Sequence, residues 1–253
     1  MLLVIDAGNT NIVGGVYQDG KLLDTLRIRT VAGKTEDEYG VIVRAILLDR
    51  GRDLSEIKRV IISSVVPQLT AAMDKMARHL FALEPVLLGA AVYKRLPVHV
   101  IAADEIGSDL VADALAAWNL FRGSCLVVDF GTALTFTAVD GSGTICGVSI
   151  APGLGTAAGS LASATAQLPA VPLEAPVSAM GRNTVQAIQA GVVLGYTGLV
   201  EYMVKRITKE LGGAKVVATG GLCRVVTGLT TVFDLVEPDL TLNGLALMEQ
   251  YLY

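Results

Sequence analysis

The residues Leu2-Leu3-Val4-Ile5-Asp6-Ala7-Gly8-Asn9-Thr10 decide how the rest of the chain is interpreted. Four apolar residues in succession predict a buried strand, and the polar residues after them predict a turn. A glycine such as Gly8 lets the backbone approach a ligand closely, and neighbouring N–H groups can point at an anion. Asp6, where the strand stops, could hold a hydrated divalent cation. The stretch is therefore a candidate phosphate loop without a Walker lysine, and an ordinary hairpin turn is the alternative.

A second copy of this pattern begins half a chain later, at Leu126-Val127-Val128-Asp129-Phe130-Gly131-Thr132-Ala133. Each copy is followed by a strand, an Asp-Gly turn (Asp19-Gly20 and Asp140-Gly141) and another strand. Asp-Gly between two alternating apolar segments is a strong hairpin signal. The repetition predicts two duplicated lobes, each with an Asp-x-Gly loop, which makes a hairpin turn a weaker explanation for either copy.

Composition indicates a folded protein with a well-packed core. The chain has 253 residues, of which 52% are hydrophobic and 17% charged. This length allows two domains of about 120 residues. The net charge is −4 and no basic run occurs, so nucleic acid is not an expected partner. The three cysteines form no Cys-x-x-Cys pair and are interpreted as reduced thiols of a cytoplasmic protein.

No membrane association is expected from the sequence. The N-terminus leads directly into a strand that ends in Asp6, which does not fit a signal peptide. The most apolar later window, Val192–Val204, is interrupted by Glu201 and is shorter than a bilayer span. With His79 and His99 as the two histidines, a histidine-based metal site is not expected either.

Local signals predict the remaining elements. Thr35 and Glu38 form a capping box that starts a helix ending near Asp49. Buried strands are expected at 60–66, 85–88, 216–219 and 232–236, with Pro67 ending the first of them. Further helices are expected at 69–81, 107–120, 157–166 and 182–211, and in a last segment capped by Thr241.

Two of these helices contain residues that need an explanation. Asp109 lies in the first turn of its helix, where the helix dipole favours a carboxylate, so a plain structural role is one interpretation and a functional role is another. The longest helix contains Gly191, Gly195 and Gly198. Each glycine in a helix interior costs about 1 kcal/mol, which close packing against another helix would offset. That helix is either internal or the same helix of a second subunit.

Eight motifs together resemble the type III pantothenate kinases of the actin-like ATPase and sugar-kinase superfamily. They occur in the family's order from one end of the chain to the other: Asp6-x-Gly8-Asn9-Thr10, Ser63-Ser64-Val65-Val66-Pro67, Gly107-x-Asp109, Asp129-Phe130-Gly131-Thr132-Ala133, Pro152-Gly153, Gly181-Arg182-Asn183-Thr184, Ala218-Thr219-Gly220-Gly221 and Asp239-Leu240-Thr241-Leu242-x-Gly244.

The resemblance implies an α/β fold of duplicated actin-like (ribonuclease H-like) domains, 1–120 and 121–253, with mixed sheets flanked by helices. The nucleotide would bind in the inter-domain cleft. It also implies a cytoplasmic homodimer that transfers the γ-phosphoryl group of ATP to pantothenate. The product, 4'-phosphopantothenate, is the first intermediate of coenzyme A biosynthesis.

The same resemblance implies roles for individual residues. Asp109 would accept the hydroxyl proton, Asp6 would lie near Mg²⁺, and Asp129 would hold a monovalent cation, K⁺ or NH₄⁺. Phosphate contacts would come from Thr132 and from the loop Asp6, Ala7, Gly8, Asn9, Thr10, Asn11, Ile12 and Val13. Pantothenate contacts would come from Val100, Gly107, Ser108, Asp109, Leu110 and Thr184.

The departures from the family pattern lie mostly in the expected pantothenate site. The family motif Gly-Ala-Asp-Arg is Gly107-Ser108-Asp109-Leu110 here, so the arginine that would bind a carboxylate is missing. Leucine offers no hydrogen-bond donor in its place. Val100, Ala102 and Ala103 stand where the family has Tyr and Asn-Pro, and Cys146 replaces a glycine. Two alternatives to a pantothenate kinase therefore remain: a nucleotide-binding regulatory or accessory protein, and a kinase for another small alcohol.

Overall fold

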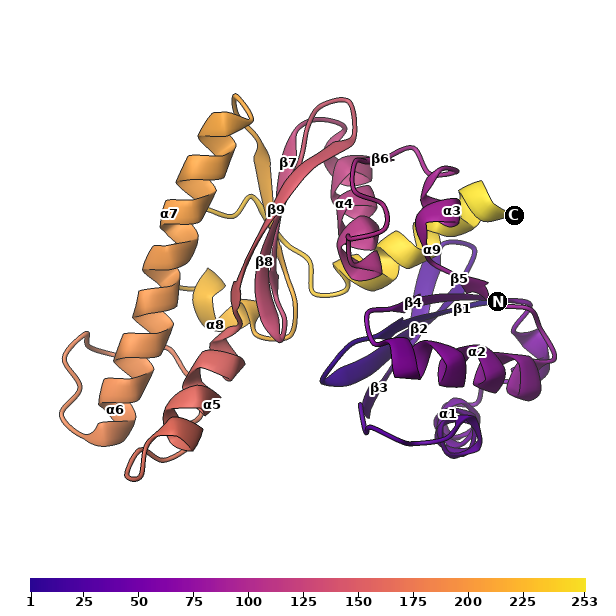
Figure 1. The fold of residues 1–253 in the computed structure, drawn as a ribbon, viewed down its shortest axis with the longest axis horizontal. Coiled ribbons are helices and arrows are strands. Elements are labelled where there is room, and N and C mark those ends of the chain that lie inside the picture. The colour runs from indigo at the N-terminus through magenta and orange to yellow at the C-terminus, as the bar shows by residue number, and fades with distance from the viewer. The chain divides into compact units, whose positions relative to one another are not determined.

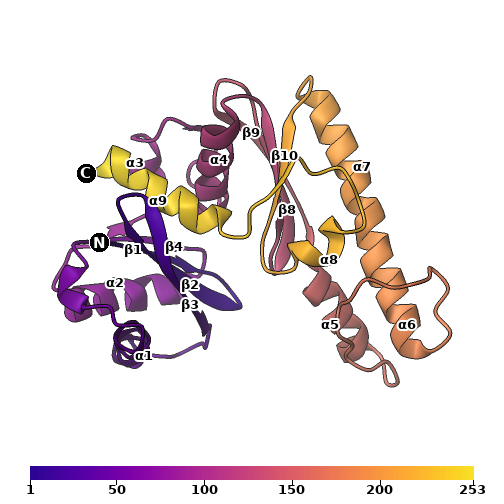
Figure 2. The ribbon, with the colours of Figure 1, turned by 180° about the vertical axis from the view of Figure 1, so that it is seen from behind.

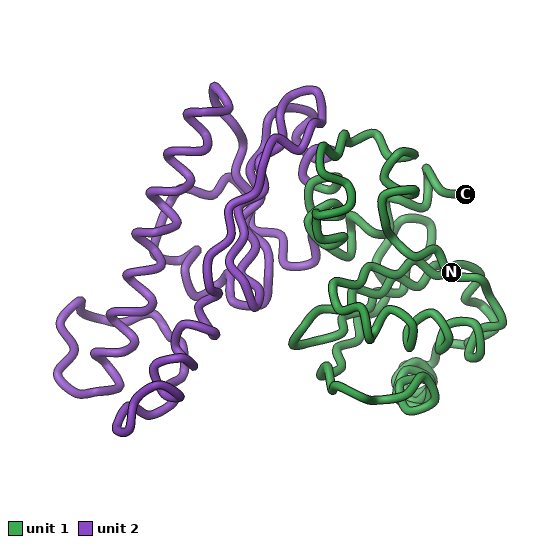
Figure 3. The backbone as a smooth tube through the Cα atoms, viewed as in Figure 1, with its two compact units in different colours: residues 1–116, 241–253 green, residues 117–240 purple.

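The computed structural model describes residues 1–253, which form two units (Figure 3). Unit 1 comprises Met1–Ala116 and Thr241–Tyr253, and unit 2 comprises Ala117–Leu240. The C-terminal helix α9 (Leu240–Leu252) thus belongs almost entirely to unit 1, although the sequence placed it in the second lobe. As a statement about domains, the division into 1–120 and 121–253 stays a prediction.

The sheet of unit 1 has the strand order β3-β2-β1-β4-β5. The pairs β1–β2 and β2–β3 are antiparallel, whereas β4 runs parallel to both β1 and β5. Two antiparallel hairpin strands and a parallel crossover make the sheet mixed, as the sequence predicted. The strands are β1 (Leu2–Ala7), β2 (Asn11–Gln18), β3 (Lys21–Arg29), β4 (Arg59–Ser64) and β5 (Val86–Leu87).

Unit 2 repeats this plan with strands in the order β11-β10-β7-β8-β9. The pairs β7–β8 and β8–β9 are antiparallel, and β10 runs parallel to both β7 and β11. The α/β fold class with two mixed sheets is confirmed. The strands are β7 (Cys125–Phe130), β8 (Ala133–Val139), β9 (Thr144–Pro152), β10 (Lys215–Thr219) and β11 (Leu235–Val236).

Helices cover both faces of the unit 1 sheet. Figures 1 and 2 show α1 (Glu36–Asp49) and α2 (Pro67–Phe81) on one side of it and α9 on the other. The capping box of Thr35 and Glu38 is present at the start of α1, as predicted. Pro67 does not simply end a strand: β4 already stops at Ser64, and Pro67 opens α2 at a position where its missing N–H costs nothing.

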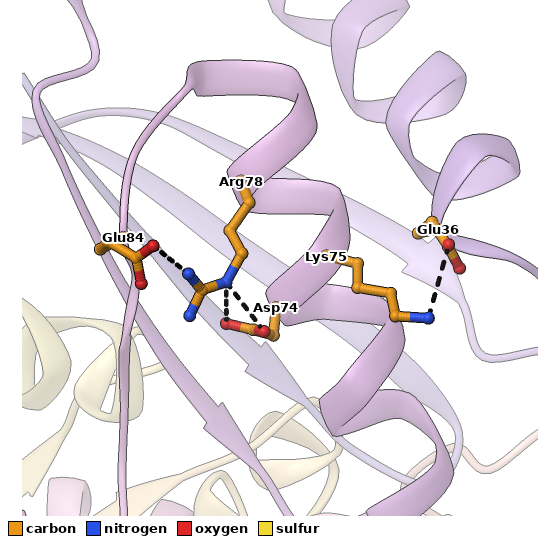
Figure 4. A network of polar contacts seen from close by, with 5 residues as sticks. All are labelled: Glu36, Asp74, Lys75, Arg78 and Glu84. Carbon is orange, nitrogen blue, oxygen red and sulfur yellow. Dashed lines mark hydrogen bonds and ion pairs between the residues drawn. The ribbon is translucent and has the colours of Figure 1, made fainter.

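The outer helices of unit 1 also carry two separate groups of ion pairs (Figure 4). Arg78 contacts Asp74 at 3.0 Å and also pairs with Glu84, and Lys75 lies 3.8 Å from Glu36 of α1. The two cationic side chains are exposed, and solvent-exposed pairs contribute little to stability. Apolar burial between the two helices and the sheet, by residues such as Met73 and Met76, therefore holds them in place.

Unit 1 is completed by the short elements α3 (Ala90–Tyr93) and β6 (His99–Val100) and by α4 (Ser108–Phe121), which continues into unit 2. Helices α4 and α9 pack closely: a Cβ on Gly244 of α9 would lie 2.0 Å from the carbonyl oxygen of Ala112 in α4. Thr241 does not cap α9 as predicted. It is the second residue of that helix, and its hydroxyl donates to Asp113 at 2.8 Å.

One continuous helix, Thr184–Glu210, covers the sheet of unit 2 together with α5 (Leu154–Ala164) and α8 (Cys223–Thr227) (Figure 2). It comprises α6 (Thr184–Gln189), a π turn (Ala190–Leu194) and α7 (Gly195–Glu210). The helix was predicted, whereas the π turn was not. Val200 and Val204 of α7 are buried in the same cluster as Phe130 and Phe136 of the sheet.

The same helix corrects one expectation about membranes. By length and composition Thr184–Glu210 could cross a bilayer, so the short window Val192–Val204 underestimated the length of the apolar helix. A core helix of a folded domain passes the same test, and 39% of its most apolar window is already buried. Its charged residues and its packing on the sheet are typical of such a core helix.

Candidate functional site

The first Asp-x-Gly loop is formed where β1 gives way to β2. Asp6 and Ala7 end β1, Gly8–Thr10 form the turn, and Asn11 begins β2. The Gly8 N–H donates to the carbonyl of Asn11 at 3.0 Å, and the Thr30 hydroxyl donates to the Gly8 carbonyl at 2.7 Å.

The side chains of this loop divide into two groups. Ala7 and Ile12 are fully buried in the apolar core, so only their backbones are available to a ligand. Asn9 and Thr10 are exposed, and Gly8, Asn11 and Val13 are half-buried. Polar contacts from this loop would therefore come from its backbone and from the exposed turn residues.

Asp6 lies near the carboxyl-terminal end of β1, where the parallel strands β1 and β4 end side by side. In the β1–β4 register Asp6 is paired with Ser63, and the Ser63 hydroxyl donates to Asp6 Oδ1 at 2.7 Å. The Ser63 and Ser108 hydroxyl oxygens are 2.9 Å apart, and the Ser64 N–H donates to Ser108 Oγ at 3.1 Å. These contacts attach the first residue of α4 to the end of β4.

Asp109 follows directly in the first turn of α4. The Leu110 N–H donates to Asp109 Oδ1 at 2.8 Å. A Cβ on Gly107 would lie 2.4 Å from the same oxygen, so a side chain at position 107 would displace the carboxylate. The structure thus brings Asp6, Ser108 and Asp109 into one hydrogen-bonded and electrostatically coupled group.

The two carboxyl groups influence each other. Burial raises the pKa of Asp6 to about 7, and the negative charge of Asp109 adds to this rise, whereas the Ser63 hydroxyl opposes it. Burial also raises the pKa of Asp109. Two nearby carboxylates in a partly dry environment favour a bound cation, which would relieve their repulsion.

These residues fit a hydrated Mg²⁺. No group of three or more His, Cys, Asp or Glu side chains is placed to hold a metal ion anywhere in the chain. Mg²⁺ commonly keeps several waters and takes only one or two protein carboxylates, the other ligands being substrate phosphates. A single protein ligand such as Asp6 is sufficient for that mode of binding.

The second Asp-x-Gly loop is built in the same way between β7 and β8. Thr132 lies in the turn, and its carbonyl accepts hydrogen bonds from the Gly153 N–H at 3.0 Å and the Thr156 hydroxyl at 2.7 Å. A Cβ on Gly153 would lie 2.3 Å from the Gly131 carbonyl oxygen. Gly153 therefore lets the start of α5 approach the loop closely.

Asp129 is the second-last residue of β7, and the backbone after strand β10 packs closely against it. Gly220, with φ of +90°, follows the paired strand β10, and a Cβ on it would lie 2.2 Å from Asp129 Oδ1. In the sheet register Asp129 is paired with Thr219 on one side and Thr135 on the other. Both hydroxyl oxygens are buried and have no hydrogen-bond partner. Neutral oxygens beside a carboxylate suit a cation with oxygen ligands, so these residues fit the expected K⁺ or NH₄⁺.

The expected pantothenate residues are distributed over both units. Gly107, Ser108 and Leu110 surround Asp109, and Leu110 is only 7% exposed. Val100, in the short strand β6, is half-buried. Thr184 belongs to unit 2, where it begins α6 after the cap Asn183.

Thr184 also lines a cavity of unit 2. This cavity has a volume of about 290 Å³, and its other lining residues are apolar: Leu161, Leu168, Ala187, Ile188, Gly191 and Val192. Thr184 supplies the only side-chain hydroxyl there. The cavity alone does not identify a ligand.

Sequence comparison relates the whole chain to one enzyme family. A family model described as type III pantothenate kinase matches residues 2–206. The chain belongs to the type III pantothenate kinase family. A type III pantothenate kinase from Moorella thermoacetica is 41% identical over 249 residues, which cover 98% of each chain.

Solved structures extend this relationship to the fold. The ethanolamine utilization protein EutJ from Carboxydothermus hydrogenoformans matches with a TM-score of 0.58 and 17% identity, covering 97% of this chain and 89% of that one. A ROK hexokinase from Thermus thermophilus matches with a TM-score of 0.50 and 16% identity, covering 98% and 97%. Such low identities show the fold alone, and the predicted actin-like and sugar-kinase fold of this type III pantothenate kinase family member is confirmed.

Proposed function

We propose that this chain is an ATP-dependent kinase that phosphorylates the primary hydroxyl of pantothenate to give 4'-phosphopantothenate. One observation carries the proposal: a chain of this family retains the coupled carboxyl pair Asp6 and Asp109 at the edge of its first sheet. Phosphoryl transfer depends on positioning and charge neutralisation, and it needs little covalent participation by the protein. These are the properties that such a pair can provide.

Asp109 accepts the hydroxyl proton in this proposal. Its raised pKa makes the ionised carboxylate a stronger base than an exposed aspartate, and general-base groups contribute about 100- to 10,000-fold to rates. Its position is fixed by the Leu110 N–H and by the absence of a side chain at Gly107.

Asp6 and the backbone of the loop from Ala7 to Val13 hold the nucleotide phosphates. Mg²⁺, when bound near Asp6, neutralises charge that develops on the transferred phosphoryl group. Thr132, from the second loop, contacts phosphate. Binding of the nucleotide by both lobes together stays a prediction.

Asp129 holds a monovalent cation, K⁺ or NH₄⁺. The support for this is the pair of buried, unpartnered hydroxyls of Thr135 and Thr219, which flank Asp129 in the sheet. The melting temperature measures this directly, because a cation that binds only the folded protein stabilises it by mass action. KCl should raise the melting temperature above that in choline chloride of equal ionic strength, and Thr219→Val should remove most of the difference.

The pantothenate side of the site uses Gly107, Ser108, Leu110, Val100 and Thr184. Leu110 gives no charged contact to the carboxylate of pantothenate, and this observation favours the second candidate, a kinase for a small alcohol without a carboxylate. A nucleotide-binding accessory protein is the remaining alternative. In each case we propose a cytoplasmic protein.

The expected homodimer would form through the exposed glycines of the long helix. Nothing lies within 4 Å of the position that a Cβ would occupy on Gly191, Gly195 or Gly198, and all three residues are exposed. Their cost to the helix would be offset if a second copy of the helix packed against this smooth face.

ADP release with ATP, Mg²⁺ and pantothenate tests the proposal. We expect turnover that depends on pantothenate, increases with KCl and is lost in Asp109→Asn. A panel of small alcohols without a carboxylate is assayed in parallel. Turnover on one of these and not on pantothenate would support the second candidate, and ATP binding without turnover on any would support the accessory protein.

A further inference from the structure

Three hydrogen bonds form an unbroken chain from the start of α4 to Asp6. The Ser64 N–H donates to Ser108 Oγ at 3.1 Å, the Ser108 and Ser63 hydroxyls lie 2.9 Å apart, and the Ser63 hydroxyl donates to Asp6 Oδ1 at 2.7 Å. A serine hydroxyl has one proton to donate. Because the proton of Ser63 is used for Asp6, Ser108 must be the donor in the central bond. With Asp6 ionised, every bond in the chain therefore points towards its carboxylate.

This chain is closed to solvent in its middle. Ser63 is completely buried and Ser108 is 5% exposed. A buried donor or acceptor that loses its partner costs more than the bond itself contributes, because water cannot replace the partner. Hydrogen bonds in such a chain also polarise one another. The orientation of the Asp6 carboxyl group is thus tied to the presence of the Ser108 hydroxyl, two bonds away.

Ser108 is adjacent to Asp109 and lies opposite the loop that holds Asp6. We propose that Ser108 is a positioning residue, which holds the Asp6 carboxylate, through Ser63, in the orientation that binds Mg²⁺-ATP. The inference rests on the proposed function and adds a residue to it. The bond between Ser108 and Ser63 also limits Ser108 as a substrate contact. Its hydroxyl proton is committed to Ser63, so only its backbone N–H can donate to a substrate.

The test measures binding of ATP to Ser108→Ala, Ser63→Ala and the double variant by titration calorimetry, with Mg²⁺ and with EDTA in its place. Ser108→Ala should weaken binding of Mg²⁺-ATP by about 2- to 13-fold, the effect of one neutral hydrogen bond, and Ser63→Ala, which loses a bond to a carboxylate, should weaken it at least as much. The double variant should be little worse than the more affected single variant, since both substitutions interrupt the same chain. Binding of ATP in EDTA should change much less, because the orientation of Asp6 matters mainly through the metal.

Thr70→Ala is the matched control. The Thr70 hydroxyl donates to Ser64 Oγ at 2.9 Å, so it is bonded to the same segment but lies outside the chain that ends at Asp6. This variant should bind Mg²⁺-ATP like the parent, and its melting temperature shows what the loss of one hydroxyl here does to stability alone. Turnover by the parent is assayed first and reports on the proposed function separately.

Three results would overturn the inference. One is unchanged Mg²⁺-ATP binding in Ser108→Ala. The second is an equal loss with and without Mg²⁺, which would indicate a general structural effect. The third is strict additivity of the two serine substitutions in the double variant.

Discussion

Asp6→Asn should stabilise the protein at neutral pH while impairing its use of ATP. In the folded protein the pKa of Asp6 is raised to about 7 from 3.8, first by burial and then by the charge of Asp109. Between these two pH values the unfolded chain has already lost a proton that the folded protein still binds. The contribution of Asp6 to stability is therefore fully present below about pH 3.8 and is lost as the pH rises to about 7.

The size of this effect follows from the pKa difference. One pH unit corresponds to about 1.4 kcal/mol, so a rise from 3.8 to about 7 costs the folded state about 4 kcal/mol above pH 7. Asparagine has nearly the same shape and does not ionise. It can still accept the hydrogen bond from Ser63, and any change in that bond is the same at every pH.

Urea unfolding of the parent and of Asp6→Asn from pH 4 to pH 8 measures the prediction. Urea is preferred to guanidinium chloride because it is uncharged and does not screen the carboxyl pair. EDTA is present throughout, so that no divalent cation binds near Asp6. The difference in free energy of unfolding between variant and parent should grow by about 4 kcal/mol across this range in favour of the variant.

Asp104→Asn provides the comparison, because it makes the same chemical change on an exposed side chain. Urea unfolding of this variant under the same conditions separates the effect of the substitution itself from the effect of the position of Asp6. If the curves of Asp6→Asn and the parent run parallel within about 1 kcal/mol from pH 4 to pH 8, Asp6 does not lie in the coupled and buried environment described above.

Four other substitutions test separate parts of the molecule. Asp109→Asn should lower turnover by about 100- to 10,000-fold in steady-state kinetics while ATP binding is kept; undiminished turnover would leave only a structural role at the helix start. Leu110→Arg should lower the KM for pantothenate by about 10- to 150-fold, the effect of one charge-assisted hydrogen bond. Because Leu110 is 7% exposed, the melting temperature of the Leu110→Arg variant should also fall. If the variant folds and its KM for pantothenate is not improved, the pocket takes another ligand. Gly195→Leu should convert a dimer to a monomer in light scattering, and a monomeric parent would refute the proposed interface. Gly244→Ala should cost about 1–3 kcal/mol in urea unfolding, because the added methyl group meets a backbone carbonyl, whereas Gly159→Ala, with open space around it, should not destabilise.

Local chemistry explains why much of the fold could be predicted. The apolar runs that become β1 and β7, and the Asp-Gly turns after β2 and β8, depend only on neighbouring residues. The Thr35–Glu38 capping box is local as well. In contrast, the π turn at Ala190–Leu194 leaves no comparable signal, because its sequence Ala-Gly-Val-Val-Leu is also compatible with an ordinary α-helix.

The candidate site was predictable in its charged residues and not in the groups that support them. Asp6 and Asp109 stand out because a polar residue follows an apolar run or opens a helix. The contact of Ser63 with Ser108 joins residues 45 positions apart, and the contact of Ser63 with Asp6 depends on the parallel register of β1 and β4. Thr135 looked like an ordinary strand residue, and Thr219 stood out only as part of a motif, since only strand pairing places the two beside Asp129.

The position of α9 has a consequence for biosynthesis. Helix α9 buries Leu242, Leu245 and Met248 in unit 1 and is tied to it by a hydrogen bond between Tyr17 and Asn243. A ribosome makes the N-terminal segment first, yet this segment lacks part of its core until the final helix leaves the exit tunnel. Unit 2 is synthesised without interruption and can complete its core earlier. During translation the N-terminal part of unit 1 therefore exposes the apolar surface that α9 later covers, and such transiently exposed surface is prone to aggregation.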